Sequence, residues 1–163
     1  MRRVRILTTG GTLDKVHDWH GETITFAGAG KSQVPEILDH GRCFAHEVEQ
    51  LFQIDSLEMT ETYRKLICER IGAASEQGIV VTHGTSTLED TARYLKECRI
   101  GKTVVLTGAM RPYSLFVSDA AFNLGGAIIA AQTLPPGVYG VMNGCIFEAD
   151  ELKKNLKLGR FDV

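Results

Sequence analysis

The chain has 163 residues, of which 44% are hydrophobic and 23% charged, close to the values of ordinary globular proteins. Eighteen Lys and Arg side chains stand against twenty Asp and Glu, a formal net charge of −2, so a general electrostatic attraction to nucleic acid or an anionic membrane is excluded. The length predicts one domain with a substantial core, and the lack of a long apolar run or signal peptide predicts a cytoplasmic protein.

Apolar strands and amphipathic helices alternate along the chain. A first strand at 4–9 ends in a Gly-Gly turn, and the polar, glycine-containing segment 13–33 predicts a long mobile loop. The remaining predicted elements are strands at 46–55, 78–82, 102–107 and 138–142, helices at 60–77, 87–98 and 118–132, and a segment at 145–147 that extends or pairs with the last strand. Ser86 to Glu89 fits a capping box, and Ser118 is the expected N-cap of the last helix.

Strands that are apolar throughout predict a parallel sheet covered on both faces. The expected fold is therefore α/β, with three layers and a mostly parallel, Rossmann-like sheet between helices. The four cysteines form no C-x-x-C pair or zinc pattern, and we expect buried free thiols.

Hydroxyl and glycine residues follow the predicted strands at their carboxyl ends, where such sheets bind ligands. Thr12 follows a Gly-Gly turn that lets the backbone approach a ligand, and Thr85 precedes a helix whose N-terminus is electropositive. Both are candidate hydroxyl nucleophiles. The alternative is that both are turn and cap residues.

Five blocks, in order, resemble the L-asparaginase/glutaminase family: TTGGT (8–12), DSLEMT (55–60), VVTHGTSTLEDTARYL (80–95), VVLTGAMRP (104–112) and SDAAFNLGGA (118–127). The resemblance covers nearly the whole chain. It implies that residues 1–163 are a single domain of the asparaginase N-terminal type, without the C-terminal domain that members of the family usually carry.

The resemblance also implies roles for single residues. Thr12 matches the nucleophile, Thr85 the hydroxyl of a second catalytic triad, and Ser56 a serine that binds the substrate carboxylate. Counting from VMNG (141–144) places Lys154 at the triad lysine, although a single gap would place Lys153 there, and both lysines could instead belong to a solvated basic tail. The expected substrate-binding positions are Gly11, Ser56, Gly84 and Ser86.

Three positions depart from the family pattern. Ser86 replaces an aspartate that binds the substrate's α-amino group, so free amino acids should bind less well. Leu57 replaces a glutamine. The segment 13–33 lacks the loop tyrosine, and His17 or His20 could act as the base in its place. The alternatives for the histidines are a weak metal pair or simple exposure on a loop.

Three further residues near these blocks have structural interpretations. His83 is expected to orient its turn by hydrogen bonding. Asp119 is expected to favour the following helix or to hold Thr12 or Arg111 in place. Arg111 itself could bind a carboxylate or pair with an aspartate.

The resulting hypothesis is hydrolysis of a small-molecule side-chain amide, that of L-asparagine or a related compound, by a threonine nucleophile, with neither metal nor organic cofactor. A non-catalytic or regulatory small-molecule binder is the alternative. A nucleotide-binding domain is a third hypothesis, which the lack of a full phosphate-loop pattern disfavours. No nucleic-acid or membrane partner is expected. A homodimer or larger assembly is predicted from apolar residues on the helices at 60–77 and 118–132, with the 13–33 loop near the contact.

Overall fold

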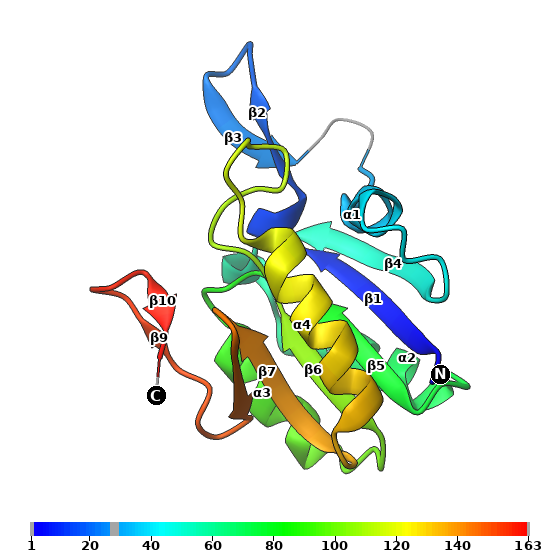
Figure 1. Cartoon of the computed structure of the whole chain (residues 1–163). Helices are drawn as coiled ribbons and strands as arrows, with labels where there is room; N and C mark the ends of the chain where they lie inside the picture. Colours follow the sequence, from blue (N-terminus) through cyan, green and yellow to red (C-terminus); the bar gives the residue numbers. More distant parts are fainter. Residues whose placement is uncertain (1, 27–29, 163) are drawn as a thin grey trace.

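A six-stranded sheet in the order β4-β1-β5-β6-β7-β8 forms the centre of the computed structural model, which describes residues 2–26 and 30–162 (Figure 1). Five strands run parallel and the edge strand β8 is antiparallel to β7. The strands are β1 (Val4–Gly10), β4 (Glu47–Ile54), β5 (Gly78–Thr82), β6 (Thr103–Thr107), β7 (Gly137–Met142) and β8 (Cys145–Glu148).

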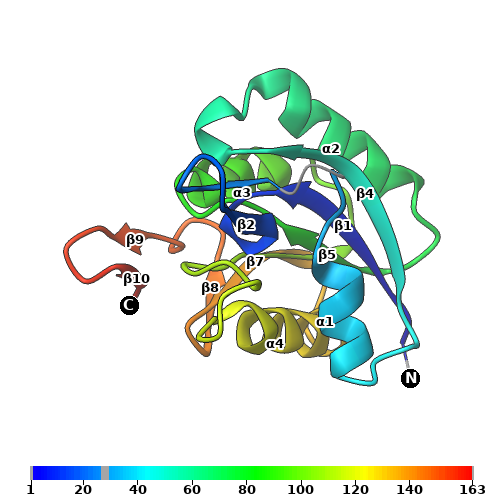
Figure 2. The same cartoon turned by 90° about the horizontal axis from the view of Figure 1, so that it is seen from above.

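Helices cover both faces of this sheet (Figure 2). α1 (Val34–His40) and α4 (Ala120–Thr133) lie on one face, and α2 (Glu61–Ala73) and α3 (Leu88–Glu97) on the other. Alternate strand residues therefore point into two separate cores: Val80 packs toward α4, whereas Ile79 and Val81 pack toward α2 and α3. This arrangement explains why the strands are apolar throughout, and the predicted three-layer α/β fold is confirmed.

The segment 13–33 differs from the predicted mobile loop. A 3₁₀ turn (Thr12–Asp14) leads into an antiparallel hairpin of β2 (Lys15–Asp18) and β3 (Thr23–Phe26), which projects beyond the sheet in Figure 1. Residues 27–29 of the segment lie outside the described residues. β2 and β3 have four residues each and are largely exposed, so their alternation of apolar and polar residues is too short to indicate strands in the sequence.

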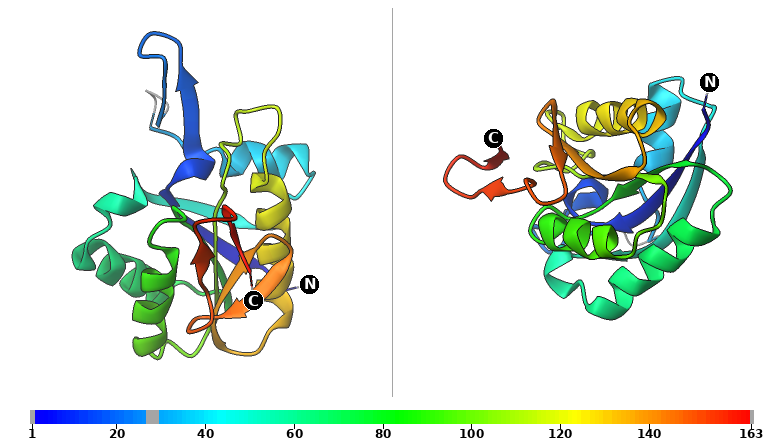
Figure 3. Two further views of the ribbon diagram at one scale, coloured as in Figure 1. Left: turned by 90° about the vertical axis from the view of Figure 1, so that its left-hand side faces the viewer. Right: turned by 90° about the horizontal axis from the view of Figure 1, so that it is seen from below.

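Helix α1 and a second hairpin, β9 (Lys154–Asn155) with β10 (Arg160–Phe161), were not predicted. α1 has Pro35 at its start and buries Val34, Ile37 and Leu38, a one-turn helical spacing. The β9–β10 hairpin extends from the body of the molecule (Figure 3) and is anchored by the buried Phe161 ring.

Two predicted helix caps need correction. α3 begins at Leu88 with Thr87 rather than Ser86 as its N-cap residue, and the Thr87 side chain makes no capping hydrogen bond to the helix. The Thr87 hydroxyl donates to the Ser56 carbonyl, at 2.8 Å. α4 begins at Ala120, two residues later than expected, although the Ser118 hydroxyl still accepts a hydrogen bond from the Ala120 N–H.

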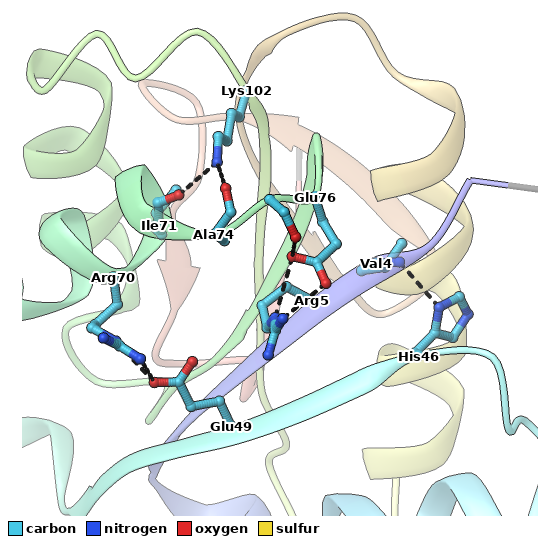
Figure 4. A network of polar contacts seen from close by, with 10 residues as sticks. Val4, Arg5, His46, Glu49, Arg70, Ile71, Ala74, Glu76 and Lys102 are labelled. Atoms are coloured by element: carbon cyan, nitrogen blue, oxygen red, sulfur yellow. Dashed lines mark hydrogen bonds and ion pairs between the residues drawn. The ribbon is translucent and has the colours of Figure 1, made fainter.

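Polar contacts at the amino end of the sheet fix the elements far from the site (Figure 4). Arg5 on β1 pairs with Glu76 at 3.0 Å, and Lys102 donates to the carbonyls of Ile71 and Ala74 at the C-terminus of α2. A cation at these carbonyls stabilises a helix end. All four cysteines are free, but none is buried, contrary to the expectation: Cys43, Cys68 and Cys98 are half-buried and Cys145 is exposed.

No helix among residues 2–26 and 30–162 has the length and apolar character needed to cross a membrane.

Candidate functional site

Four turns meet at the carboxyl ends of β4, β1, β5 and β6, which are neighbours in the sheet. In each contact the backbone of a glycine lies against a neighbouring turn. A Cβ atom on Gly11 would lie 2.4 Å from the Gly84 nitrogen, one on Gly84 would lie 2.6 Å from the Ser56 side chain, and one on Gly108 would lie 2.3 Å from the His83 carbonyl. Only glycine permits approaches this close. The predicted positions Gly11, Ser56 and Gly84 are therefore brought together.

Thr12 opens the 3₁₀ turn that follows β1. The chain reaches it through Gly10 and Gly11, which have φ of +98° and +77°, in the region that favours glycine. The Gly11 N–H donates to the Ile54 carbonyl of β4 at 2.9 Å. Thr12 is half-buried, and its hydroxyl makes no hydrogen bond within the part of the chain that the structure describes. Thr12 therefore directly follows the glycine that contacts Gly84.

Within residues 2–26 and 30–162, two of the predicted catalytic side chains, those of Thr85 and Lys154, are in hydrogen-bond contact. The Lys154 Nζ and the Thr85 Oγ1 are 2.8 Å apart. Thr85 is buried, and burial lowers the pKa of Lys154 below its usual range. Lys153 is exposed and its side chain makes no bond to Thr85, so the structure brings Lys154 and not its neighbour to this turn.

The C-terminal hairpin positions Lys154. The Phe161 N–H donates to the Asn143 Oδ1 at 2.8 Å, which holds β10 against the end of β7. A hollow of about 370 Å³ lies along this hairpin beside Lys154. Its lining includes Lys153, Lys154 and Lys157 together with the acidic side chain of Asp162.

Ser56 and Ser86 link the turns after β4 and β5. Ser56 is buried, and its Oγ accepts a hydrogen bond from the Ser86 N–H at 3.2 Å. The Ser86 side chain is exposed and makes no hydrogen bond among the described residues, so it faces solvent instead of capping α3.

His83 is wholly buried beneath the Thr85 turn. Its Nδ1 is 2.8 Å from the Gly84 carbonyl, which can only accept, so Nδ1 carries the proton and donates. Its Nε2 then accepts from the Thr91 hydroxyl at 2.9 Å, and that oxygen accepts from the Arg64 Nε at 3.0 Å. Burial lowers the pKa of His83 to about 4. The neutral ring therefore orients the turn, as its position at the strand end suggested.

Asp119 orients the turn after β6 by hydrogen bonding to its backbone. Its carboxylate accepts hydrogen bonds from the Met110 and Arg111 N–H groups, each near 3.0 Å, and from the Asn123 side chain. It therefore holds the backbone of Arg111, one of the roles predicted for it. The Arg111 side chain is exposed and forms no ion pair within the described residues.

Asp14 is a buried carboxylate that sequence reasoning missed. Its Oδ1 accepts hydrogen bonds from the Ser32 hydroxyl and the Gln33 N–H, both at 2.8 Å, and its Oδ2 is buried without a partner among the described residues. Burial outweighs these hydrogen bonds and raises the pKa of Asp14 to about 6. Asp14 thus ties the Thr12 turn to the start of α1.

The histidines predicted as substitute bases lie on the β2–β3 hairpin. His17 is exposed and contacts Trp19 edge-on, with ring centroids 5.0 Å apart. His20 is exposed at the turn of the hairpin. Within the described part of the chain neither ring hydrogen bonds to the turns of the site, and no group of three metal-ligating side chains is found there.

The buried His83 predicts a pH dependence of stability. The unfolded chain binds a proton at this residue near pH 6.5 and the folded chain only near pH 4, so stability falls as the pH drops through this window, by up to about 3 kcal/mol. His83→Asn keeps a donor for the Gly84 carbonyl but cannot titrate. Urea unfolding between pH 7 and pH 4 should show a steeper loss for the wild type than for the variant.

The raised pKa of Asp14 acts in the opposite direction, since the folded state binds its proton first as the pH falls. That contribution is common to both proteins and cancels in the comparison. Parallel pH curves for the wild type and His83→Asn would contradict the buried, neutral state of His83.

Comparisons with known proteins show the family and the fold of the chain. The family described as "Asparaginase, N-terminal" matches residues 3–160. The chain is 30% identical over 164 residues to L-asparaginase 2 of Escherichia coli, covering 93% of this chain and 46% of that protein. It is 32% identical over 168 residues to one subunit of the glutamyl-tRNA(Gln) amidotransferase of Methanococcus vannielii, covering 98% and 38%.

Among solved structures, the thermostable L-asparaginase of Thermococcus kodakarensis superposes with a TM-score of 0.80 at 26% identity, covering 98% of this chain and 50% of that one. The chain thus spans half or less of the length of these relatives.

Proposed function

Because the chain belongs to the asparaginase family, we propose that it is an amidohydrolase that releases ammonia from a side-chain amide through a threonine nucleophile. The observation that carries this proposal is the hydrogen bond between Lys154 and Thr85, together with the lowered pKa of that lysine. A lysine with a lowered pKa is more often neutral, and a neutral amine can accept a proton.

In the proposed reaction the Thr12 Oγ1 attacks the amide carbon. Lys154 takes the proton of Thr85, whose oxygen then accepts the proton that Thr12 loses. The C–N bond breaks, and its electron pair leaves with the nitrogen, which takes up a proton and departs as ammonia. Water then cleaves the ester on Thr12 and regenerates the hydroxyl. The close contact of Gly11 with Gly84 supports this relay, because it places the two threonine turns side by side.

The backbone of the same turns is proposed to bind the substrate. The N–H groups of the Gly11–Thr12 and Gly84–Thr85 turns are candidate donors for the oxyanion that forms during attack. Ser56 is proposed to bind a carboxylate, because its buried side chain lies against Gly84 in the turn that carries Thr85. We propose that this site lies in one domain of the asparaginase N-terminal type and needs no cofactor. A cytoplasmic location stays a prediction.

The serine at position 86 supports the alternative proposal, that the protein binds a small molecule without catalysing a reaction. It offers no charge to an α-amino group, and the matched relatives include both an asparaginase and an amidotransferase. The two proposals are separated by measuring ammonia release from asparagine, glutamine, N-acylated asparagine and asparagine-containing peptides. Release from any of them supports the hydrolase, and binding without release supports the alternative.

Ser86→Asp is expected to improve the binding of free asparagine by tenfold or more, since a charged hydrogen bond contributes roughly 1.5–3 kcal/mol. Stability should barely change, because the Ser86 side chain is exposed and caps nothing. Calorimetric titration measures the affinity. Gln77→Asp, which adds the same charge at the opposite end of β5, is the control and should not bind better. If Ser86→Asp leaves the affinity unchanged, this position does not face the substrate.

A further inference from the structure

The β9–β10 hairpin, which carries Lys154, has few hydrogen bonds to the rest of the molecule. In the part of the chain that the structure describes, two such bonds join residues 153–162 to other segments. One joins Lys154 to Thr85. The other runs from the Phe161 N–H to the Asn143 Oδ1 at 2.8 Å. Because holding a long lysine side chain in one conformation costs entropy, the backbone that carries it needs an anchor of its own.

Phe161 is that anchor, because it lies directly opposite Lys154. The two residues are partners in the antiparallel β9–β10 ladder. Residues that face each other in such a ladder have Cα atoms about 4.5–5.5 Å apart, so fixing one backbone position fixes the other. The Phe161 ring is 2% exposed and packs in the same core as α2 and α3, while its N–H is held by Asn143. The hairpin otherwise extends away from the body of the molecule (Figure 3).

Asn143 lies in the two-residue turn between β7 and β8. Its φ is +54° and that of Gly144 is +78°, the left-handed pair for which Asn-Gly is a preferred sequence. Glycine at position 143 would satisfy this turn equally well, because it adopts positive φ without strain. The turn therefore does not need the Asn143 side chain, and the contact that this side chain makes is the bond to Phe161.

Asn123 on α4 holds the same turn from inside the protein. Its side chain is buried, and its Oδ1 accepts a hydrogen bond from the Asn143 N–H at 3.0 Å. Its Nδ2 donates to the Gly108 carbonyl at 3.0 Å and to the Asp119 carboxylate at 2.9 Å. These partners accept only from the nitrogen and donate only to the oxygen, so the amide has one orientation. Asn143 is therefore attached to the helix that also holds the turn after β6.

We infer that Asn143 is a positioning residue for Lys154 and acts through the backbone of Phe161. The path of bonds leads from α4 through Asn143 to Phe161, and across the ladder to Lys154. Without the Asn143 side chain this end of the hairpin is released, and water reaches the amine that burial now desolvates. The effect on the reaction rate rests on the proposed function, whereas the effect on the amine does not.

Asn143→Gly removes the acceptor for Phe161 and keeps the turn. It should lower kcat for ammonia release about tenfold, the loss expected for one hydrogen bond at the strong end of the ordinary range, and leave KM nearly unchanged. Trypsin should also cut faster after the basic residues of the hairpin. Asn143→Asp keeps an acceptor and tolerates the left-handed conformation, so it is the matched control and should retain wild-type cleavage and most of kcat.

The amine of Lys154 can be followed without any substrate. In protein labelled with ¹³C-lysine, the NMR signal of Lys154 is the one that Lys154→Met lacks, and its pH titration gives the pKa of the amine. In Asn143→Gly this pKa should rise from its lowered wild-type value toward that of an ordinary lysine. Lys153, Lys157 and Asp162 line the same hollow and are present in both proteins, so the difference reports the hydration of Lys154.

The inference and the proposed function fail on different results. If no amide is turned over but the Lys154 pKa rises in Asn143→Gly, the hydrolase proposal is lost and the positioning role stands. If Asn143→Gly is folded by circular dichroism and leaves both the Lys154 pKa and the trypsin cleavage unchanged, the inference is overturned. Cleavage of Asn143→Asp as fast as that of Asn143→Gly would also overturn it, because the acceptor would then not be what holds the hairpin.

Discussion

Thr12→Ala and Thr85→Ala are each expected to lower the rate of ammonia release by more than ~100-fold, the scale of losing a nucleophile or a proton-transfer partner. Thr12 follows the glycine that contacts Gly84, and Thr85 carries the hydroxyl that accepts a hydrogen bond from Lys154. Steady-state rates on whichever amide of the panel is turned over provide the measurement.

Control variants distinguish a loss of catalytic activity from a loss of folding. Thr62→Ala removes an exposed hydroxyl from α2 and should leave the rate unchanged. Thr12→Ser and Thr85→Ser keep the hydroxyls and should retain far more activity than the alanine variants. Circular dichroism and the unfolding midpoint should show that Thr12→Ala stays folded. Full activity in both alanine variants would end the threonine hypothesis.

Lys154→Arg is expected to lower the rate by more than ~100-fold even though it keeps a positive charge beside Thr85. A guanidinium does not lose its proton at accessible pH, so it cannot accept one from the hydroxyl. Lys154→Met should be equally inactive, whereas Lys153→Met changes an exposed neighbour and should remain near the wild-type rate.

The pH profile gives an independent test of the same role. If the neutral amine is the active form, the wild-type rate should rise with pH toward the lowered pKa of Lys154 and then level off. A Lys154→Arg variant within tenfold of the wild type would show that the lysine contributes charge alone.

The central sheet could be predicted because its strands are continuous apolar runs. Such runs are typical of parallel strands that are buried on both faces of a sheet. The predicted strand 78–82 coincides with β5. The hairpins β2–β3 and β9–β10 could not be predicted. Their strands are two to four residues long, and their positions depend on distant contacts such as that of Phe161 with Asn143.

The location of the candidate site at one edge of the sheet could also be predicted from the sequence. Thr12, Ser56 and Thr85 follow strands that neighbour one another in a parallel sheet, so their convergence follows from topology. Asp14 was missed because its raised pKa is caused by burial near α1, a helix that the sequence reasoning did not identify. The capping role of Ser86 was wrong because α3 begins one residue later than the sequence pattern indicates, with Thr87 as its N-cap residue.

The glycine contacts that join the four turns have a consequence for how the site moves. With backbone against backbone at Gly11 and Gly84, and at Gly108 and His83, no slack remains for one turn to shift while its neighbours stay in place. Local opening is then a cooperative event of the whole edge rather than the fluctuation of separate loops. We therefore expect this edge to be rigid and the projecting hairpins to be the parts that adjust when a ligand binds.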